Sequence, residues 1–214
     1  MALRLKLLSR WEPEWFLKII LNKLSKASIE GLQAILQHNL TDQEYGKAKN
    51  NFSKSAMQLN GNLNDRRKKM TAIHNEQVKI LIDTLGRDKA IEKGRRIMFQ
   101  KGILLGRTFR HFLGVKDNLE DLMAAAKILY QALGIDFNIK VIKENKTILI
   151  VHHCTLAQNY NAETCRILSA VDEGVVQGLN PDIKVEFTTR LTEGHNCCMA
   201  SVKIKNDKKL NWSK

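Results

Sequence analysis

The spacing of apolar residues changes near residue 135, and this change limits most strongly what the chain can fold into. Before it, apolar side chains recur at the three- and four-residue intervals of amphipathic helices, as Trp15 and Ile19 do. After it, short runs rich in β-branched residues alternate with polar residues, which is typical of strands. We therefore predict an α+β protein, with a helical region at residues 1–135 packed on a sheet-bearing unit at 136–206.

Several residues in the first part mark the ends of helices. Thr41 followed by Glu44 is a capping-box pattern that opens a helix. Gly86 and Gly134 each follow a long helical pattern, where a glycine commonly ends a helix. A further helix is expected from near Asp88 to Gly114.

The second part predicts a ββαββ unit. The stretches NIKVIK, TILIVHHC, IKVEFTTRL and CCMASVKIK read as strands, and NAETCRILSAVDEGVVQGL between the second and third reads as a helix. The simplest arrangement is an antiparallel sheet with the helix on one face. Residues 207–214 are expected to form a basic tail.

Charge is unevenly distributed along the chain. The net charge is +13, and residues 1–135 hold 24 Lys and Arg against 13 Asp and Glu, whereas residues 136–214 hold 11 against 9. A basic protein attracts a nucleic acid or a small anionic molecule. Arg66–Lys69 is a run of four basic residues, but such a run is usually a solvated helix face, and no recognition motif accompanies it. We expect a small anionic ligand and no nucleic acid.

No stretch predicts a signal peptide or a membrane-spanning helix, so we expect a cytoplasmic protein without a membrane partner. In that compartment the four cysteines would be thiols. All four lie in the second part, which is therefore the expected place of a site. The sequence leaves a homodimer open.

The stretch VHHC, residues 151–154, ends the second predicted strand. Because neighbours on a strand point to opposite faces, alternation places His152 and Cys154 on the face of Ile150, and His153 on that of Val151. The simplest interpretation of Cys154 is a small buried apolar residue, as most free cysteines are.

Other polar residues of the unit could converge with Cys154. Cys165, Ser169 and Asp172 form a polar stripe on the following helix, and Glu173 adjoins it. Alternation places Thr188 and Arg190 together on the next strand. The turn EGHNCC brings His195, Cys197 and Cys198 to the start of the last strand. The alternative interpretation of Asp172 and Arg190 is that they are ordinary solvated charges.

Two chemistries fit these residue types. Zinc takes four nitrogen, sulfur or oxygen ligands, and the histidines and cysteines supply them, although no C-x-x-C spacing is present. Alternatively, a cysteine nucleophile needs a base or a positive neighbour, which His152, His153 or His195 could supply. An arginine such as Arg190 could hold a substrate carboxylate.

Three glycines in the first part, Gly94, Gly102 and Gly106, recur at multiples of four. They predict close packing of one helix on another, with a pocket wall as the alternative. No glycine-rich phosphate loop follows a strand, which disfavours a nucleotide cofactor.

The second part resembles the L-2-amino-thiazoline-4-carboxylic acid hydrolase family. The resemblance lies in HHC and in TCRILSAVDEGVVQGLNPDIKVEFTTRLTEGHNCCM. It implies ring-opening hydrolysis of a cyclic isothiourea to an N-carbamoyl-cysteine. We expect no cofactor, with zinc as the alternative. The matching positions are Cys154, Cys165, Asp172, Glu173, Gly194 and Cys198.

From the chemistry of that reaction we expect Cys154 to attack the amidine-like carbon while His153 or His152 relays the proton. Asp172 would hold the exocyclic nitrogen and Arg190 the carboxylate, with Cys165, Glu173, Thr188, His195 and Cys198 around the substrate. The unit also resembles the 4-vinyl reductase domain, some members of which bind zinc. Cys165 and Cys198 match that pattern, but Phe187 and Arg190 occupy the other two positions. A non-catalytic small-molecule or metal-binding module is therefore the alternative.

Overall fold

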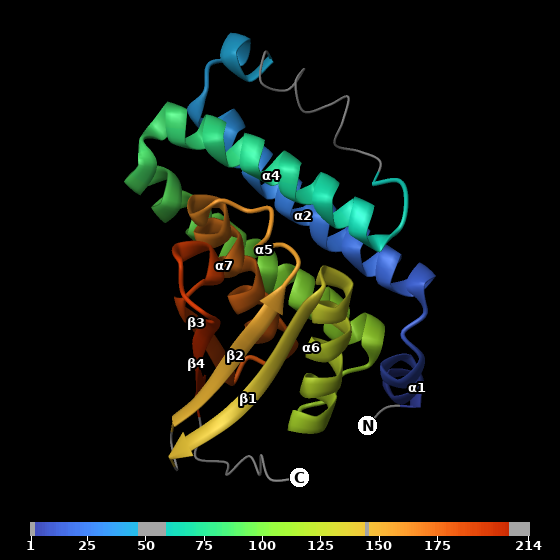
Figure 1. Cartoon of the computed structure of the whole chain (residues 1–214). Coiled ribbons are helices and arrows are strands. Elements are labelled where there is room, and N and C mark those ends of the chain that lie inside the picture. The colour runs from blue at the N-terminus through green and yellow to red at the C-terminus, as the bar shows by residue number, and fades with distance from the viewer. Residues whose placement is uncertain (1–2, 47–58, 144–145, 206–214) are drawn as a thin grey trace.

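The computed structural model describes residues 3–46, 59–143 and 146–205. The helices that precede the sheet include α1 (Leu3–Trp11), α2 (Glu14–Asn39), α4 (Leu63–Leu85), α5 (Arg87–Leu113) and α6 (Leu119–Leu133). They are followed by β1 (Ile135–Lys143), β2 (Lys146–Cys154), α7 (Ala162–Leu179), β3 (Ile183–Thr189), a short 3-10 helix at Leu191–Glu193 and β4 (Cys198–Ile204) (Figure 1). The α+β class and the ββαββ order are confirmed.

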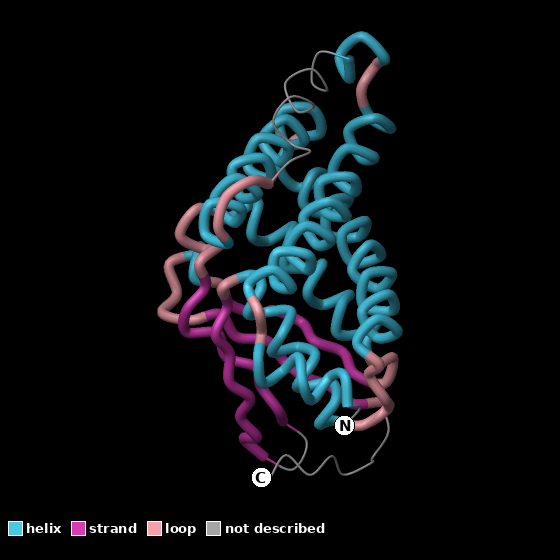
Figure 2. Tube along the Cα trace, turned by 90° about the vertical axis from the view of Figure 1, so that its right-hand side faces the viewer, coloured by secondary structure: helices cyan, strands magenta, loops and turns pink. Residues whose placement is uncertain are grey.

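The four strands form one antiparallel sheet in the order β1-β2-β4-β3. The last strand is therefore inserted between β2 and β3, and β1 and β3 are the two edges. Helices cover one face of this sheet, with α7 packed on β3 and α6 on β1 (Figures 1 and 2). The site-bearing ends of β2, β3 and β4 consequently lie under helices.

The helix ends follow the local signals in the sequence. The backbone N–H of Thr41 donates to Glu44 Oε2 at 3.0 Å, and the N–H of Glu44 lies 3.4 Å from Thr41 Oγ1, so the predicted capping box is confirmed. Gly114 and Gly134 adopt left-handed conformations after α5 and α6. The tip of the β1–β2 hairpin, residues 144–145, and the predicted tail at 207–214 lie outside the described residues.

The crossing of α5 and α7 is the closest contact between the helical region and the sheet-bearing unit. A Cβ on Gly102 would overlap the carbonyl oxygen of Val171 and lie 2.9 Å from Gly174 Cα. A Cβ on Gly106 would overlap the carbonyl oxygen of Val175 in the same way. The glycines therefore allow backbone to pack on backbone, and the prediction of close helix packing is confirmed.

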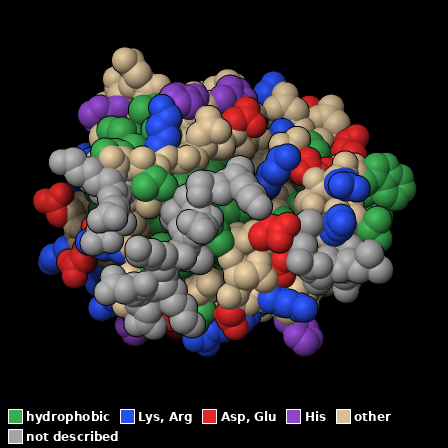
Figure 3. Space-filling model, turned by 90° about the horizontal axis from the view of Figure 1, so that it is seen from below, with side chains coloured by type: hydrophobic (Ala, Val, Ile, Leu, Met, Phe, Trp, Pro, Cys, Tyr) green, Lys and Arg blue, Asp and Glu red, His purple; other side chains and the backbone are tan. Residues whose placement is uncertain are grey.

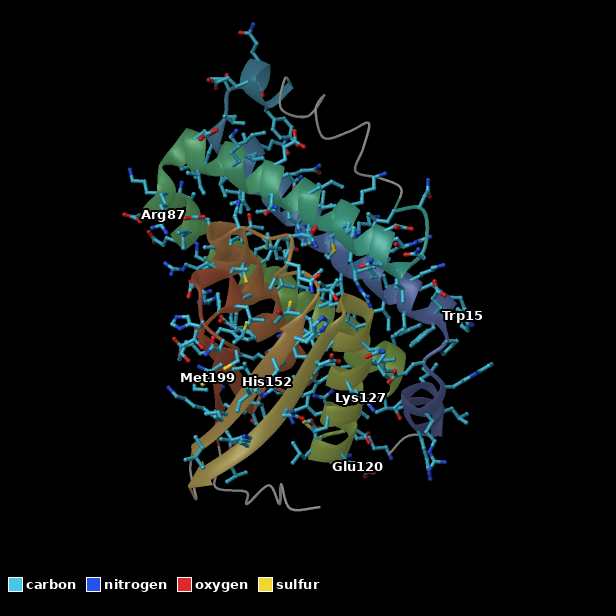
Figure 4. The ribbon with its side chains drawn as sticks, in the orientation of Figure 1. Trp15, Arg87, Glu120, Lys127, His152 and Met199 are labelled. Carbon is cyan, nitrogen blue, oxygen red and sulfur yellow. The ribbon has the colours of Figure 1, made fainter. Side chains whose placement is uncertain are left out.

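Two further helices complete the layer above α5 and α7. The long helices α2 and α4 lie side by side across the top of the molecule in Figure 1. Arg87 and Trp15 mark opposite ends of this layer in Figure 4. No helix of the described ranges combines the length and apolar character that are needed to cross a bilayer.

Candidate functional site

An irregularity in β2 decides where Cys154 points. Asp136 pairs with His153, but Phe137 pairs with Val151, so β2 contains one extra residue opposite β1. Such a β-bulge resets the alternation of side chains. Cys154 pairs with Ile135 and lies on the helix-covered face with Val151. The prediction that Cys154 shares the face of Ile150 was wrong, because simple alternation does not count the extra residue.

β3 contains a matching irregularity at the same end of the sheet. Phe187 pairs with Ala200 and Thr189 with Met199, so Thr188 is the extra residue. The next residue, Arg190, is thereby turned inward and is buried, whereas Thr188 is exposed. The prediction that these two residues share a face was also wrong. Two bulges thus direct a thiol and a guanidinium beneath the helices.

Four side chains from three elements form what we call the thiol–carboxyl cluster: Cys154 of β2, Cys165 and Asp172 of α7, and Cys198 of β4. Electrostatic interactions connect Cys165 with Cys154, Cys198 and Asp172, and connect Cys198 with Asp172. Cys165 and Asp172 are seven residues apart on α7 and so lie on one side of that helix. The cluster brings together four of the residues predicted from the sequence.

Asp172 is the carboxyl of this cluster. Burial, with a smaller contribution from the neighbouring Glu173 carboxylate, raises its pKa from 3.8 to about 7. Burial disfavours the charged form of a carboxyl, and a nearby negative charge acts in the same direction. A carboxyl with a pKa near neutrality can both accept and return a proton at physiological pH.

The thiols of the cluster are protonated at rest. Burial raises the pKa of Cys154 to about 12 and that of Cys165 to about 11. The pKa of Cys198 is also raised by burial, and its sulfur accepts the backbone N–H of Leu191 at 3.3 Å. A neutral thiol is a weak nucleophile, so an attacking cysteine here needs a proton acceptor or a bound cation.

Two tyrosines border the thiol–carboxyl cluster. The hydroxyl of Tyr130 on α6 is buried and, among the described residues, has no hydrogen-bond partner. Burial raises its pKa well above the usual range, and the charges of Asp172 and Cys154 contribute. Tyr160, in the loop between β2 and α7, has its pKa raised by burial and then by Cys165, Cys154 and Asp172. Both hydroxyls therefore lie within electrostatic range of the cluster.

Arg190 is held against α7. Its Nε and Nη2 donate to Ser169 Oγ at 3.2 and 3.1 Å, and its Nη1 lies 3.7 Å from Glu193 Oε1. The latter distance is long for a hydrogen bond, so Nη1 remains able to donate to an anion. Glu193 is bound more tightly by Arg166, at 2.6 Å.

Glu173, the next residue along α7, lies in the contact with α5. Both of its oxygens accept from Arg95 Nη2, at 3.1 and 2.9 Å, and Oε1 also accepts the backbone N–H of Phe187 at 3.2 Å. This buried ion pair ties α5, α7 and β3 together. The structure thus gives Glu173 protein partners, whereas the sequence suggested a place beside the substrate.

The three candidate histidines lie apart from the thiol–carboxyl cluster. His152, His153 and His195 are exposed, and His153 Nδ1 lies 3.4 Å from Asp136 Oδ2 on β1. His152 is labelled on the sheet in Figure 4, and several histidines lie at the molecular surface in Figure 3. Thr188 is exposed as well and donates to the carbonyl of Met199.

Over the described part of the chain, no three His, Cys, Asp or Glu side chains are grouped as a metal ion would require. The cysteines of the thiol–carboxyl cluster come from a strand end, a helix and a second strand, without histidine partners.

The sequence did not predict Tyr130, Tyr160 or Arg95 as part of the site. An aromatic or basic residue on a helical pattern is ordinarily interpreted as core or as solvated surface.

A carboxyl, three thiols and a guanidinium thus lie near one another between the sheet and the helices. The family model described as L-2-amino-thiazoline-4-carboxylic acid hydrolase matches residues 66–201, a stretch that includes the whole site. The chain belongs to this family. No curated protein sequence matches the chain.

The chain is similar to several solved structures at low sequence identity. A trafficking protein particle complex subunit 3 from Naegleria fowleri, covalently bound to palmitic acid, is 13% identical, covers 65% of this chain and 95% of its own, and has a TM-score of 0.50. The phenol-responsive sensory domain of the transcription activator PoxR is 16% identical over 74% of this chain and 89% of its own, with a TM-score of 0.45. An H-NOX protein from S. oneidensis is 14% identical, covers 82% of this chain and 99% of its own, and has a TM-score of 0.42.

Proposed function

We propose that the protein is a hydrolase that opens a cyclic isothiourea of the L-2-amino-thiazoline-4-carboxylate type, with Cys154 as nucleophile and Asp172 as the acid–base group. The observation that carries the proposal is the convergence of Asp172 with three partly or fully buried thiols, where burial raises the pKa of Asp172 to about 7. Membership of the hydrolase family supports the reaction type.

Asp172 takes the role that the sequence suggested for His152 or His153. Both histidines are exposed on the sheet, and a general base must come within hydrogen-bond reach of the proton that it removes. Asp172 belongs to the thiol–carboxyl cluster, and its pKa is raised to about 7. The exocyclic nitrogen of the substrate would bind at this carboxyl, and Arg190 Nη1 would hold the ring carboxylate.

The first half of the reaction opens the ring. The Cys154 thiol adds to the amidine-type carbon, and its proton moves to the basic ring nitrogen of the substrate. The bond between this carbon and the ring sulfur then breaks, and the leaving sulfur takes the proton of Asp172. The products are a new substrate thiol, an amidinium carbon bound to Cys154 and an Asp172 carboxylate that neutralises the cation.

The second half releases the product. Asp172 takes a proton from water, and the hydroxide adds to the carbon that Cys154 holds. The bond to the Cys154 sulfur breaks, the sulfur regains a proton from the adduct, and N-carbamoyl-cysteine leaves. One water is consumed, and both Cys154 and Asp172 return to their initial protonated forms.

Release of thiol from L-2-amino-thiazoline-4-carboxylate by the purified protein tests this proposal. We expect catalytic thiol release by the wild type, none above background for Cys154→Ala, and a loss of about 10²–10⁴-fold in kcat for Asp172→Asn. His153→Ala should keep nearly full activity, because its side chain lies outside the thiol–carboxyl cluster.

Two results would overturn parts of this proposal. Loss of activity in His153→Ala, with Asp172→Asn still active, would return the acid–base role to the histidine. Binding of the heterocycle by the wild type without any thiol release would instead make the protein a non-catalytic small-molecule-binding module.

A further inference from the structure

The proposed reaction leaves one buried polar chain unused. His74 on α4 is 1% exposed and lies between two hydroxyls. Its Nε2 is 2.9 Å from Ser28 Oγ on α2, and its Nδ1 is 2.6 Å from Tyr160 Oη. The rings of His74 and Tyr160 also stack, with centroids 5.9 Å apart. The chain thus runs from the helical layer to the edge of the thiol–carboxyl cluster.

The position of the Ser28 hydrogen determines the tautomer of His74. Ser28 Oγ lies 2.9 Å from the carbonyl of Leu24 and 3.0 Å from that of Ser25. A carbonyl only accepts, so the single hydroxyl hydrogen of Ser28 is directed to these oxygens. Ser28 Oγ must then accept from the imidazole, which places the His74 proton on Nε2.

The hydroxyl of Tyr160 therefore donates its hydrogen to His74. Burial lowers the pKa of His74 to about 3, so at neutral pH the ring holds one proton, and Nδ1 is bare. Tyr160 Oη donates its only hydrogen to that nitrogen. Its lone pairs remain, and toward any other group Tyr160 is a hydrogen-bond acceptor only.

The loop that bears Tyr160 is fixed by the same helix. Asn75 on α4 donates to the carbonyl of Asn159 at 2.7 Å, and its Oδ1 lies 3.4 Å from the backbone N of Asn161. Asn161 in turn caps α7, accepting the N–H of Thr164 at 2.7 Å. α4 therefore holds Tyr160 at a defined position relative to the helix that bears Cys165 and Asp172.

We propose that His74 is a positioning residue that fixes Tyr160 as an acceptor beside the thiol–carboxyl cluster, and that this acceptor selects ligands with N–H donors over their carbonyl analogues. A 2-amino heterocycle presents N–H groups to Tyr160 Oη. Its 2-oxo analogue presents a carbonyl oxygen, and two acceptors that face each other in a buried site leave both unsatisfied. This inference rests on the proposed function and names the ligand class that the site accepts.

Calorimetry with two ring compounds tests this selection. All proteins carry Cys154→Ala, so that the ligand is not consumed. With Tyr160 and His74 intact, L-2-amino-thiazoline-4-carboxylate should bind about 10–100-fold more tightly than 2-oxothiazolidine-4-carboxylate. Tyr160→Phe should remove the preference by weakening the amino ligand.

Substitutions of His74 separate positioning from a general structural role. His74→Leu frees the Tyr160 hydroxyl to donate, so the oxo ligand should bind more tightly and the preference should vanish. His74→Asn retains an acceptor near the place of Nδ1 and should restore the preference. An equal loss of affinity for both ligands in His74→Leu would overturn the inference.

Nitrogen NMR of the imidazole tests the same inference without a ligand. We expect a neutral His74 with its proton on Nε2, and a proton on Nδ1 would overturn the inference. Equal binding of the two ring compounds by the parent protein would overturn this inference but not the proposed function, because the proposed function is tested by thiol release. Binding of neither compound would overturn both.

Discussion

Asp172, the carboxyl of the thiol–carboxyl cluster, lowers the stability of the folded protein at neutral pH. Its pKa in the folded protein is about 7, against 3.8 for an ordinary aspartate. Between these values the folded state binds more protons than the unfolded state, so stability falls as pH rises from about 4 to 7 and levels off above. The ionised carboxyl is therefore destabilising at neutral pH.

Asp172→Asn should accordingly stabilise the protein at pH 8 but not at pH 4. The expected gain at pH 8 is roughly 2–4 kcal/mol, measured by urea unfolding. Asp83→Asn, at an exposed carboxyl of α4, is the matched control and should change little at either pH. An equal effect of Asp172→Asn at both pH values would contradict the burial of this carboxyl.

At the residue scale, the sequence predicted which residues come together better than how their side chains are oriented. Cys154, Cys165, Asp172 and Cys198 were expected to converge, and they do. His152 and His153 were expected there because simple alternation does not register the bulge of β2. Tyr130, Tyr160 and His74 come from separate elements, so nothing in their spacing links them to the cysteines.

At the scale of elements, the glycines of α5 and α7 determine how closely the two helices approach. Gly102→Ala should destabilise the protein by at least about 1–3 kcal/mol in urea unfolding, because the added methyl group would overlap the carbonyl of Val171. Gly46→Ala is the control, since Gly46 is helical and a Cβ there meets nothing within 4 Å. We expect the control to be neutral or to stabilise by up to about 1 kcal/mol.

A Gly102→Ala variant as stable as the Gly46→Ala control would show that α5 and α7 can separate without loss of stability.

The helix ends were predictable because capping residues and glycines act locally. The order of the strands was not, because the insertion of β4 between β2 and β3 depends on pairing between segments far apart in the chain.

At the scale of the whole molecule, a single hydrophobic core joins the helical region to the sheet-bearing unit. It includes Ile20 and Leu81 from the first part and Ile167 and Ala200 from the second. The α5–α7 crossing and the Arg95–Glu173 ion pair lie between the two parts. Separation of the two parts would therefore expose apolar residues of both.

We expect a fragment of residues 136–206 to be unfolded when it is expressed alone, because α7 would expose the face that α5 covers. Amide NMR dispersion and far-UV circular dichroism would measure this. Addition of a fragment of residues 1–135 should restore folding. A dispersed spectrum of the isolated C-terminal fragment would contradict the dependence of its folding on the helical region.

The bulges in β2 and β3 affect how this sequence should be aligned with its relatives. A relative with one histidine between the valine and the cysteine of VHHC would have a regular strand and the same inward thiol. A relative with one threonine before the arginine would likewise keep the guanidinium inward. Loss of the extra residue at either of these two places is therefore neutral for the site, whereas loss of a single residue elsewhere in either strand reverses its faces.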